Sequence, residues 1–334
     1  MAITIKDIAR ETGLSIATVS KYMNGATLRE KNRIAIERAI KKHHYTVNEY
    51  ARGLKSNKSR TIGVVIPELS NLFVTQIITK MEEILRAHGY SVIICDCHTD
   101  GNLECEAVRF LLGKMVDGIV NMPVCSDGRH LQPAVEKKIP IVLIDRPIES
   151  LTEIADSILI DNTAAAEKAI SYLLQHGHRQ IGIIVGPEDV FTSAQRLKGY
   201  FNAFEAYGLS ADKENILHGD YTVQGGYESM RRLLIRKNCT AVFITNYEMT
   251  LGGIIAVNEM GLKIPDEISV IGFDNLDLSR ITHPRLTIVT QPLEQIGAQA
   301  AKLLLEHLMG DAPFVPITES LATTLQEGAS VRQL

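Results

Sequence analysis

One short phrase occurs twice in the chain and marks the beginning of two similar stretches. Arg60–Ile66 reads RTIGVVI, and Arg179–Val185 reads RQIGIIV. After each phrase, short apolar runs alternate with longer amphipathic runs, a pattern typical of strands that alternate with helices. Strands that are apolar throughout indicate parallel sheets covered by helices on both faces. The repeat therefore predicts two doubly wound α/β lobes that face one another, with a ligand in the crevice beyond the carboxyl ends of their strands.

The same alternation predicts the individual elements. The predicted strands are Thr61–Ile66, Ser91–Cys95, Gly118–Asn121, Pro140–Ile144, Ser157–Ile160, Arg179–Val185, Ala241–Thr245 and Ser269–Phe273. The predicted helices of the two lobes are Val74–His88, Asn162–His176, Gln195–Tyr207 and Glu248–Met260. A chain of 334 residues is long enough for two or three such domains.

The first 60 residues differ in charge from the rest. They carry 13 Lys and Arg against 5 Asp and Glu, a net charge of +8, whereas the other residues carry 22 against 34, a net charge of −12. Such an asymmetry is typical of a polyanion-binding head on a body with another task. Charge alone does not distinguish nucleic-acid binding from a solvated charged surface.

Three short helices are predicted in this basic head. Thr4–Asp7 is a helix start, in which the hydroxyl can accept a hydrogen bond from a free amide and the acid favours the helix N-terminus. Gly13 ends the first helix, a second follows over Ile16–Met23, and Thr27–Glu30 is a capping box for a third that runs to His44. The first two helices fit the spacing of a helix-turn-helix. The alternative is a generic three-helix bundle, against which the net charge of +8 favours DNA binding.

The chain shows no targeting, catalytic or cofactor signature. It has no signal-peptide start and no apolar run near the roughly 18 residues that span a bilayer, so we expect a cytoplasmic protein. Five cysteines argue against a disulfide framework, and Cys95–His98 (CDCH) lacks the spacing of zinc sites and is interpreted as a strand end with two small core thiols. Dinucleotide, P-loop and nucleophile-elbow motifs are missing. We expect no enzymatic activity, no metal and no cofactor.

Several segments together resemble the LacI/GalR (lactose/galactose repressor) family of transcriptional regulators. The likeness covers nearly the whole chain in order, through Thr4–Gly25, Ala51–Leu54, Ile62–Pro67, Gln195–Tyr200, Pro265–Asp274 and Thr290–Leu293. The family implies an all-α helix-turn-helix headpiece, a hinge helix and a two-lobed α/β core like that of the periplasmic binding proteins. It also implies regulation of transcription by a dimer.

On this resemblance the chain divides into three parts. Residues 1–46 form the helix-turn-helix DNA-binding domain, and residues 47–59 form the hinge helix and linker. The remaining residues form the effector-binding core with its two doubly wound parallel sheets. Its N-lobe comprises residues 60–161 and 290–320, and its C-lobe comprises residues 162–289 and 321–334.

The resemblance also assigns residues of the head to DNA. Ile16, Ala17 and Lys21 correspond to base-reading positions on a recognition helix in the major groove. The first two can offer apolar contact to a thymine methyl group, and Lys21 can donate to guanine. Lys21 stands where the family commonly has Arg, whose rigid fork Lys lacks, so base discrimination there should be looser. The other residues of the head assigned to DNA are Thr4, Ser15 and Asn24, of which Thr4 and Asn24 resemble phosphate-positioning residues.

Val47–Lys55 matches the hinge helix of the family. An isolated helix this short is marginal in water, so we expect it to order only when DNA holds it. The resemblance makes Leu54 an apolar wedge in the minor groove, and the alternative is that Leu54 packs between the lobes. Two departures weaken the match: Val47 stands where the family usually has Pro, and Gly53 lowers helix propensity by about 1 kcal/mol relative to Ala.

The core carries the matching effector positions. They are Phe73, Asp145, Thr192, Arg196, Tyr221, Asn246, Asp274 and Gln291. Four of them, Asp145, Arg196, Asn246 and Asp274, follow predicted strands or open predicted helices. Asp145 and Asp274 can accept hydrogen bonds from hydroxyl groups, Arg196 can donate two, and Asn246 can do both. Tyr221 would stack on the ligand and Phe73 would form a pocket wall. The alternatives are a structural salt bridge for Arg196 and Asp274 and core packing for the two aromatic residues.

These assignments predict a sequence-specific repressor that binds a palindromic double-stranded operator as a homodimer and is controlled allosterically by a small molecule of the sugar class. The sequence shows no leucine heptads after residue 321, so we expect no helical tetramerisation tail. It leaves open the effector, the regulated genes and whether the effector induces or corepresses. The alternatives are a global regulator switched by a protein partner and, in a different class, a solute-binding receptor or a sugar-processing enzyme.

Overall fold

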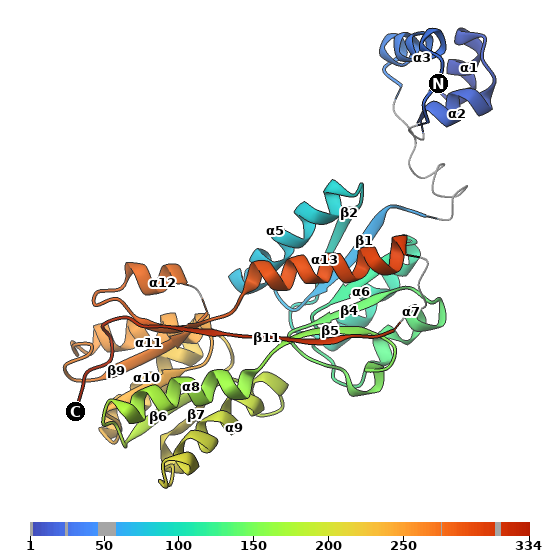
Figure 1. Cartoon of the computed structure of the whole chain (residues 1–334). Coiled ribbons are helices and arrows are strands. Elements are labelled where there is room, and N and C mark those ends of the chain that lie inside the picture. Colours follow the sequence, from blue (N-terminus) through green and yellow to red (C-terminus); the bar gives the residue numbers. More distant parts are fainter. Residues whose placement is uncertain (1–2, 24–25, 46–57, 275, 311–314) are drawn as a thin grey trace. The chain divides into compact units, whose positions relative to one another are not determined.

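The computed structural model describes residues 3–23, 26–45, 58–274, 276–310 and 315–334. It divides into two compact units, Met1–Arg60, here called the headpiece, and Thr61–Leu334, here called the core (Figure 1). In the described ranges we find no helix with the length and apolar character that a membrane span requires. Most of the predicted hinge, residues 47–57 with Leu54, lies outside the described residues, as does Asn24.

The described part of the headpiece contains three helices around a small apolar centre. They are α1 (Ile5–Thr12), α2 (Ile16–Met23) and α3 (Glu30–His43). The chain leaves α1 through Gly13, whose φ of 65° lies in the left-handed region that glycine adopts without strain. Ile8, Val19 and Ile36 contribute one fully buried side chain from each helix. The predicted order of three helices is confirmed.

The two predicted helix starts of the headpiece have different outcomes. At α1, Asp7 Oδ2 accepts hydrogen bonds from the Thr4 backbone N–H at 3.0 Å and from the Thr4 hydroxyl at 2.7 Å. The predicted capping box at Thr27–Glu30 is wrong, because α3 has Arg29 as its N-cap and that residue makes no capping side-chain hydrogen bond. Glu30 is thus the first residue of α3, and Thr27 lies too far before the helix to be its N-cap.

The first sheet of the core contains six described strands in the order β2-β1-β3-β4-β5-β11, all parallel. The strands are β1 (Thr61–Ile66), β2 (Ser91–Asp96), β3 (Gly118–Asn121), β4 (Ile141–Ile144), β5 (Asp156–Ile160) and β11 (Thr318–Leu321). The helices that accompany it are α5 (Leu72–Ala87), α6 (Gly101–Gly113), α7 (Gln132–Glu136), α13 (Leu293–Met309) and the 3₁₀ turns η1 (Arg129–Leu131) and η2 (Glu149–Leu151).

The second sheet repeats this arrangement in the order β7-β6-β8-β9-β10-β12. Its strands are β6 (Ile181–Val185), β7 (Ile216–His218), β8 (Ala241–Ile244), β9 (Ser269–Phe273), β10 (Thr287–Thr290) and β12 (Thr324–Gln326), of which only β12 is antiparallel to its described neighbour. Its helices are α8 (Asn162–Gln175), α9 (Phe191–Ala206), α10 (Val223–Arg236), α11 (Tyr247–Glu259), α12 (Leu276–Ile281) and the 3₁₀ turn η3 (Lys213–Asn215).

The repeated phrase occupies equivalent positions in the two sheets. β1 lies between β2 and β3, and β6 lies between β7 and β8. In both cases the next strand along the chain is added on one side and the following strand on the other, so the strand order reverses there. This is the switch point of a doubly wound sheet, where ligands commonly bind beyond the carboxyl ends of the strands. The expected pair of doubly wound lobes is confirmed.

The chain passes between the two sheets three times, after β5, after β10 and after β11. Helix α13 follows β10 of the second sheet but packs against α5 beside the first sheet (Figure 1). β11 then pairs with β5, and β12 returns to pair with β10. These passages tie segments at the end of the chain to both halves of the core.

Several boundaries differ from the sequence-based expectation. Helix α9 begins at Phe191, four residues before the predicted start at Gln195, so it includes Thr192. Cys97 is fully buried, and its thiol donates a hydrogen bond to the Ile66 carbonyl at 3.0 Å, as expected of a small core residue. Cys95 is only half-buried, because β2 is the outermost strand of its sheet.

A glycine sets the close packing of α8 on α9 and yields a stability prediction. A Cβ atom on Gly199 would lie 2.2 Å from the Thr163 carbonyl oxygen and 2.9 Å from Ala166 Cβ. We expect Gly199→Ala to lower the free energy of unfolding by about 1–3 kcal/mol, because the helices must separate. Urea unfolding followed by circular dichroism measures this.

The matched control is Gly113→Ala in α6, where an added Cβ meets no atom within 4 Å. That variant should be neutral or gain up to about 1 kcal/mol from helix propensity. Equal unfolding midpoints for Gly199→Ala and the parent protein would contradict the close-packing argument.

Candidate functional site

The headpiece presents the predicted base-reading residues on the outside of α2. Val19 on this helix is fully buried, whereas Ile16 has 46% of its surface exposed, and Ala17 and Lys21 are exposed as well. Ser15 Oγ accepts a hydrogen bond from the Thr18 backbone N–H at 3.1 Å, so the hydroxyl also caps the helix. The burial of one side of α2 therefore leaves an apolar and cationic face free for a partner, in the arrangement that a recognition helix needs.

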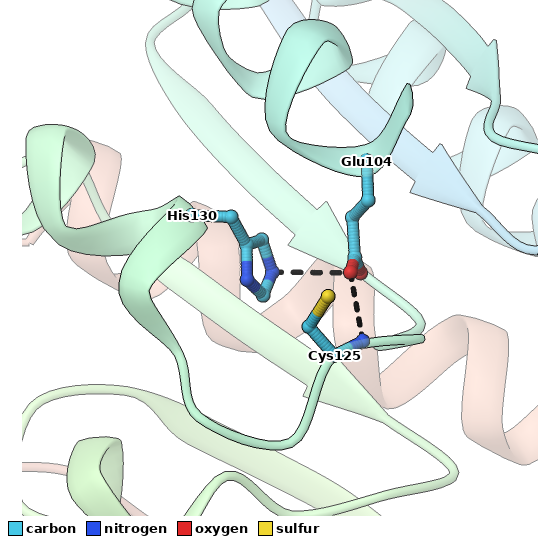
Figure 2. A group of neighbouring side chains, drawn as sticks. All are labelled: Glu104, Cys125 and His130. Atoms are coloured by element: carbon cyan, nitrogen blue, oxygen red, sulfur yellow. Dashed lines mark hydrogen bonds and ion pairs between the residues drawn. The ribbon is translucent and has the colours of Figure 1, made fainter. Parts of the chain in front are cut away.

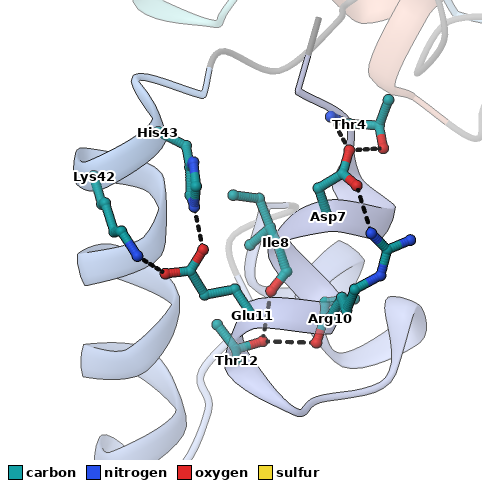
Figure 3. A network of polar contacts seen from close by, with 9 residues as sticks. Thr4, Asp7, Ile8, Arg10, Glu11, Thr12, Lys42 and His43 are labelled. Atoms are coloured by element: carbon teal, nitrogen blue, oxygen red, sulfur yellow. Dashed lines mark hydrogen bonds and ion pairs between the residues drawn. The ribbon is translucent and has the colours of Figure 1, made fainter. Parts of the chain in front are cut away.

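Polar contacts hold α3 against the two helices before it. Glu11 on α1 accepts a hydrogen bond from Lys42 Nζ at 2.7 Å and forms an ion pair with His43 (Figure 3). The hydrogen bond from Lys42, followed by that from His43, lowers the pKa of Glu11 below its ordinary value. Tyr22 Oη on α2 donates to Glu37 on α3 at 3.0 Å. The contacts of Glu11 thus join α1 to α3, and that of Tyr22 joins α2 to α3.

In the core, three predicted effector residues share an unusual backbone conformation. Asp145 follows β4 with a φ of 74°, Asp274 follows β9 with a φ of 64°, and Tyr221 follows β7 with a φ of 63°. Non-glycine residues rarely adopt positive φ, and such strain gathers at ligand sites. All three lie at the carboxyl ends of strands, where a doubly wound fold places its ligand.

Asp274 is a buried carboxylate with few partners. Gln291 Nε2 donates to its Oδ1 at 2.5 Å, and its backbone N–H donates to the Val289 carbonyl. Burial raises the pKa of Asp274 to about 7, and the negative charges of Glu248 and Asp145 add to this, against the opposing effects of Arg196 and Gln291. Since Asp145 belongs to the loop after β4, the carboxyl edges of the two sheets are close enough to influence each other electrostatically.

Arg196 is held by the second sheet rather than by a carboxylate. Its Nε donates to Asn162 Oδ1 at 2.7 Å, its Nη1 donates to the Thr245 carbonyl, and its guanidinium lies 4.0 Å from the centre of the Phe273 ring. Among the described residues we observe no direct ion pair between Arg196 and Asp274. The guanidinium is thus oriented by neutral groups, and Nη2 is the nitrogen for which no hydrogen bond to the described residues is observed.

The side chain of Tyr221 is fixed at both its ring and its hydroxyl. The hydroxyl shares hydrogen bonds with Ser193 Oγ at 2.6 Å and with Thr192 Oγ1 at 3.1 Å. A Cβ atom on Gly186 would lie 2.1 Å from Tyr221 Cζ, so the ring lies directly on that glycine. Thr192 is therefore in the same cluster as Tyr221, where the sequence analysis placed both.

Asn246 and Phe73 also have local structural roles. Asn246 caps α11, with Oδ1 accepting from the Met249 N–H at 2.9 Å and Nδ2 donating to Glu248 at 2.6 Å. Phe73 is half-buried against the main hydrophobic cluster, and its backbone N–H is capped by Asn71. Part of the Phe73 side chain thus packs in the core, which is the alternative given for this residue in the sequence analysis.

Three residues at these edges were missed by sequence reasoning. Asn162 is buried and orients Arg196, Arg146 Nε donates to Asp145 Oδ2 at 3.2 Å, and Glu248 has its pKa raised, chiefly by burial. Each forms a hydrogen bond with a predicted site residue: Asn162 with Arg196, Arg146 with Asp145, and Glu248 with Asn246. A search for polar residues within two positions of strand ends and helix starts would have found all three.

Comparison with known proteins finds family matches in two segments of the chain. Residues 4–48 match the family described as bacterial regulatory proteins, lacI family, and residues 170–331 match a periplasmic binding protein-like domain. The chain is 36% identical to catabolite control protein A of Priestia megaterium over 311 residues, 92% of this chain and 93% of that protein. It is 34% identical to the HTH-type transcriptional repressor CytR of Escherichia coli (strain K12) over 313 residues, 92% and 91% of the two chains.

Solved structures agree with the fold. A complex of the transcriptional regulator CelR with cellobiose has a TM-score of 0.75 at 28% identity and covers 98% of this chain and 99% of its own. The Lac repressor dimer bound to operator and the anti-inducer ONPF has a TM-score of 0.87 at 24% identity, with 99% and 100% covered. The expected fold, a helix-turn-helix headpiece with a two-lobed core of periplasmic-binding-protein type, is confirmed.

The raised pKa of Asp274 predicts a pH-dependent stability of the core. A carboxyl group whose pKa rises on folding stabilises the folded state fully below its unfolded pKa, and this contribution is lost as the pH rises through about 7. Asp274→Asn removes the buried charge and keeps a residue that tolerates positive φ. We expect the variant to be more stable than the parent at about pH 8, by up to about 4 kcal/mol, and to lose this advantage near pH 4.

Thermal unfolding at a series of pH values measures this difference. Asp189→Asn, which removes an exposed carboxylate, is the matched control and should show no such trend. A stability difference between Asp274→Asn and the parent that stays constant between about pH 4 and pH 8 would contradict the buried-charge argument.

Proposed function

Because this chain belongs to the lacI family of bacterial regulatory proteins, we propose that it is a transcriptional repressor whose binding to operator DNA is controlled by a neutral small molecule of the sugar class. We infer that it acts as a homodimer on a palindromic operator. The proposal of DNA binding rests on the exposed face of α2, in a unit with a net charge of +8. Relatives are named as a catabolite control protein and a transcriptional repressor, and we propose no catalytic activity.

In the proposed complex, α2 enters the major groove. Ile16 and Ala17 contact thymine methyl groups, and Lys21 donates to guanine acceptors. Thr4 and Asn24 position phosphates, and Ser15, which precedes α2, is the remaining residue of the headpiece proposed to contact DNA. Residues 47–59 form the hinge, in which Leu54 is the proposed minor-groove wedge.

The proposed effector site is formed by the carboxyl edges of both sheets. Phe73, Asp145 and Gln291 belong to the N-lobe, residues 60–161 and 290–320. The other site residues belong to the C-lobe, residues 162–289 and 321–334. Asp145 and Asp274 accept from ligand hydroxyls, Arg196 donates, and Tyr221 stacks. The further contributors are Thr192, Asn246 and Gln291. The cellobiose named in the CelR complex is one such polyhydroxyl ligand.

The charges at these edges favour a neutral ligand over an anionic one. Asp145, Glu248 and Asp274 provide three carboxyl groups, and each contributes to the electrostatics of the cluster. Arg146 pairs with Asp145, and two nitrogens of Arg196 donate hydrogen bonds to Asn162 and to the Thr245 carbonyl. A phosphorylated sugar would add negative charge beside these acids, whereas hydroxyl groups satisfy them as donors.

Control follows from the way the chain joins the lobes. A ligand that bridges both edges favours one angle between them, and the proposed hinge transmits that angle to the headpiece. Such coupling typically amounts to about 1–3 kcal/mol and is reciprocal between DNA and effector. Induction and corepression are both compatible with it.

Base reading by Lys21 is tested on fragments of source-genome DNA selected by the full-length protein. Lys21→Ala should weaken binding to selected fragments by about 10–100-fold and relax the preference at one base position, because a specific base contact is worth about 1–3 kcal/mol. Fluorescence anisotropy at fixed salt measures both affinities. Lys31→Ala on α3 is the matched control for loss of one exposed positive charge. Equal losses on selected and random fragments would assign Lys21 to phosphates instead.

Effector recognition is tested with Asp145→Asn, which keeps the side-chain shape and tolerates the positive φ. A panel of neutral monosaccharides and disaccharides first identifies the ligand that changes the DNA affinity of the parent. For that ligand, the variant should need at least about tenfold higher concentration, because a hydrogen bond to a charged acceptor is lost. Its DNA affinity without ligand should be unchanged, as should the response of Asp266→Asn, an exposed control. If no sugar in the panel acts on the parent, the sugar class is wrong and a protein-switched regulator is favoured.

A further inference from the structure

A second group of polar side chains gathers at the first sheet and includes none of the proposed effector residues. Glu104 on α6, Cys125 in the loop after β3 and His130 in η1 point toward one another (Figure 2). Each offers one ligand atom, a carboxylate oxygen, a thiol sulfur and an imidazole nitrogen, and these atoms all lie within 4.8 Å of one another. His130 Nε2 lies 3.4 Å from Glu104 Oε1.

Glu104 and His130 are buried, Cys125 is half-buried, and the carboxylate of the group is held in place. The Glu104 side chain has no exposed surface, and neither has that of His130. Glu104 Oε1 accepts from the Val124 backbone N–H at 2.9 Å and from Asn121 Nδ2 at 3.1 Å. Glu104 Oε2 accepts from the Cys125 backbone N–H at 2.8 Å, so this oxygen keeps a lone pair for a further ligand.

Two buried polar atoms beside this carboxylate have no hydrogen-bond partner. Within the described residues, they are His130 Nδ1 and Asn121 Oδ1. Asn121 Nδ2 also lies 3.0 Å from His130 Nε2 and donates to it, so Nε2 carries the lone pair of the ring. A metal ion on Nε2 would replace this hydrogen bond. Buried polar atoms without partners are costly: the Nδ1–H group of His130 calls for an acceptor such as water, and Asn121 Oδ1 calls for a donor or a cation.

The donor set matches one class of cation. Oxygen, nitrogen and sulfur donors together are characteristic of zinc, whereas calcium and magnesium prefer oxygen alone. A divalent ion with one carboxylate, one thiolate and one neutral imidazole has no net charge, which suits a buried position. Burial, followed by the hydrogen bond with Glu104, raises the pKa of the Cys125 thiol to about 11, so binding must release the thiol proton.

We propose that Glu104, Cys125 and His130 bind a zinc ion whose fourth position faces a neighbouring cavity. That cavity, of about 400 Å³, is lined by Cys125 and His130 and also by Cys105, Arg109 and Asp127. Three protein ligands with one open position fit a site that holds water or a further ligand. The same loop accepts a hydrogen bond at the Pro123 carbonyl from Arg146 Nη1 at 3.3 Å, so the metal would fix a segment adjoining Asp145.

A second group in the described chain could also bind a metal ion, and the test must distinguish it from the proposed site. Glu68, Asp96 and His98 also have ligand atoms within 4.8 Å of one another, but they lie nearer the surface and include no sulfur. Cobalt(II) distinguishes the two, because only coordination by Cys125 produces a thiolate-to-cobalt charge-transfer absorption in the near ultraviolet.

The full-length chain, freed of metal by a chelator, is titrated with cobalt(II) and then with zinc(II) in the presence of a competing chromophoric chelator. We expect one equivalent of cobalt to give the charge-transfer absorption and zinc to displace it. Cys125→Ser should abolish the absorption, and His130→Gln should lower zinc affinity by at least about tenfold. Cys105→Ser, in the same cavity, and His98→Gln, in the group with Glu68 and Asp96, should change neither.

Thermal unfolding keeps the test independent of folding defects. In chelator, Cys125→Ser should unfold within the error of the parent, and added zinc should raise the midpoint of the parent alone. The proposal is overturned if the parent gives no charge-transfer absorption, or if Cys125→Ser binds zinc with the parent's affinity and stoichiometry.

Discussion

Parallel strand pairing is the constraint on which the core depends. In the first sheet every described strand runs in the same direction, so each loop after a strand emerges at one edge. Asp145 after β4 and Cys125 after β3 lie on such loops. The second sheet repeats the order, and Asp274 after β9 lies at its carboxyl edge in the same way. Parallel hydrogen bonding gives neighbouring strands the same direction, so their carboxyl ends lie at the same edge. Residues far apart in the chain therefore meet there.

Buried carboxylates at these edges are satisfied to different degrees. Glu104 accepts two backbone amides and one side-chain amide. Asp274 accepts from Gln291, and burial keeps its pKa high. A buried carboxylate with one strong donor is costly until another donor arrives, and a ligand hydroxyl is such a donor. The strained backbone at Asp274 supports the same interpretation, since the surrounding sheet must maintain it.

Local pattern predicted most elements well and some of their details poorly. Strands such as Gly118–Asn121 and Ser269–Phe273 have the predicted bounds, because an apolar run between polar turns has few ways to pair. The start of α9 was missed, because Thr192 and Ser193 read as loop residues although they are buried in the first turn. The Thr27 capping box was wrong, because a sequence match does not show where the helix begins. The effector residues were assigned by family resemblance. Asn162, which orients Arg196, was not among the residues that the resemblance assigns.

The sequence by itself determined the class of protein, since the charge asymmetry, the period of apolar residues and the motif order are all local properties. These sufficed for a basic helical head and two doubly wound lobes. Only the tertiary structure decided that β11 and β12 end in different sheets, that Arg196 bonds Asn162 and Thr245, and that Glu104 meets Cys125 and His130. The last group is spread over α6, a loop and η1, and its spacing resembles no metal motif. Its convergence depends on sheet order and helix packing, which bring together residues that local sequence pattern cannot relate.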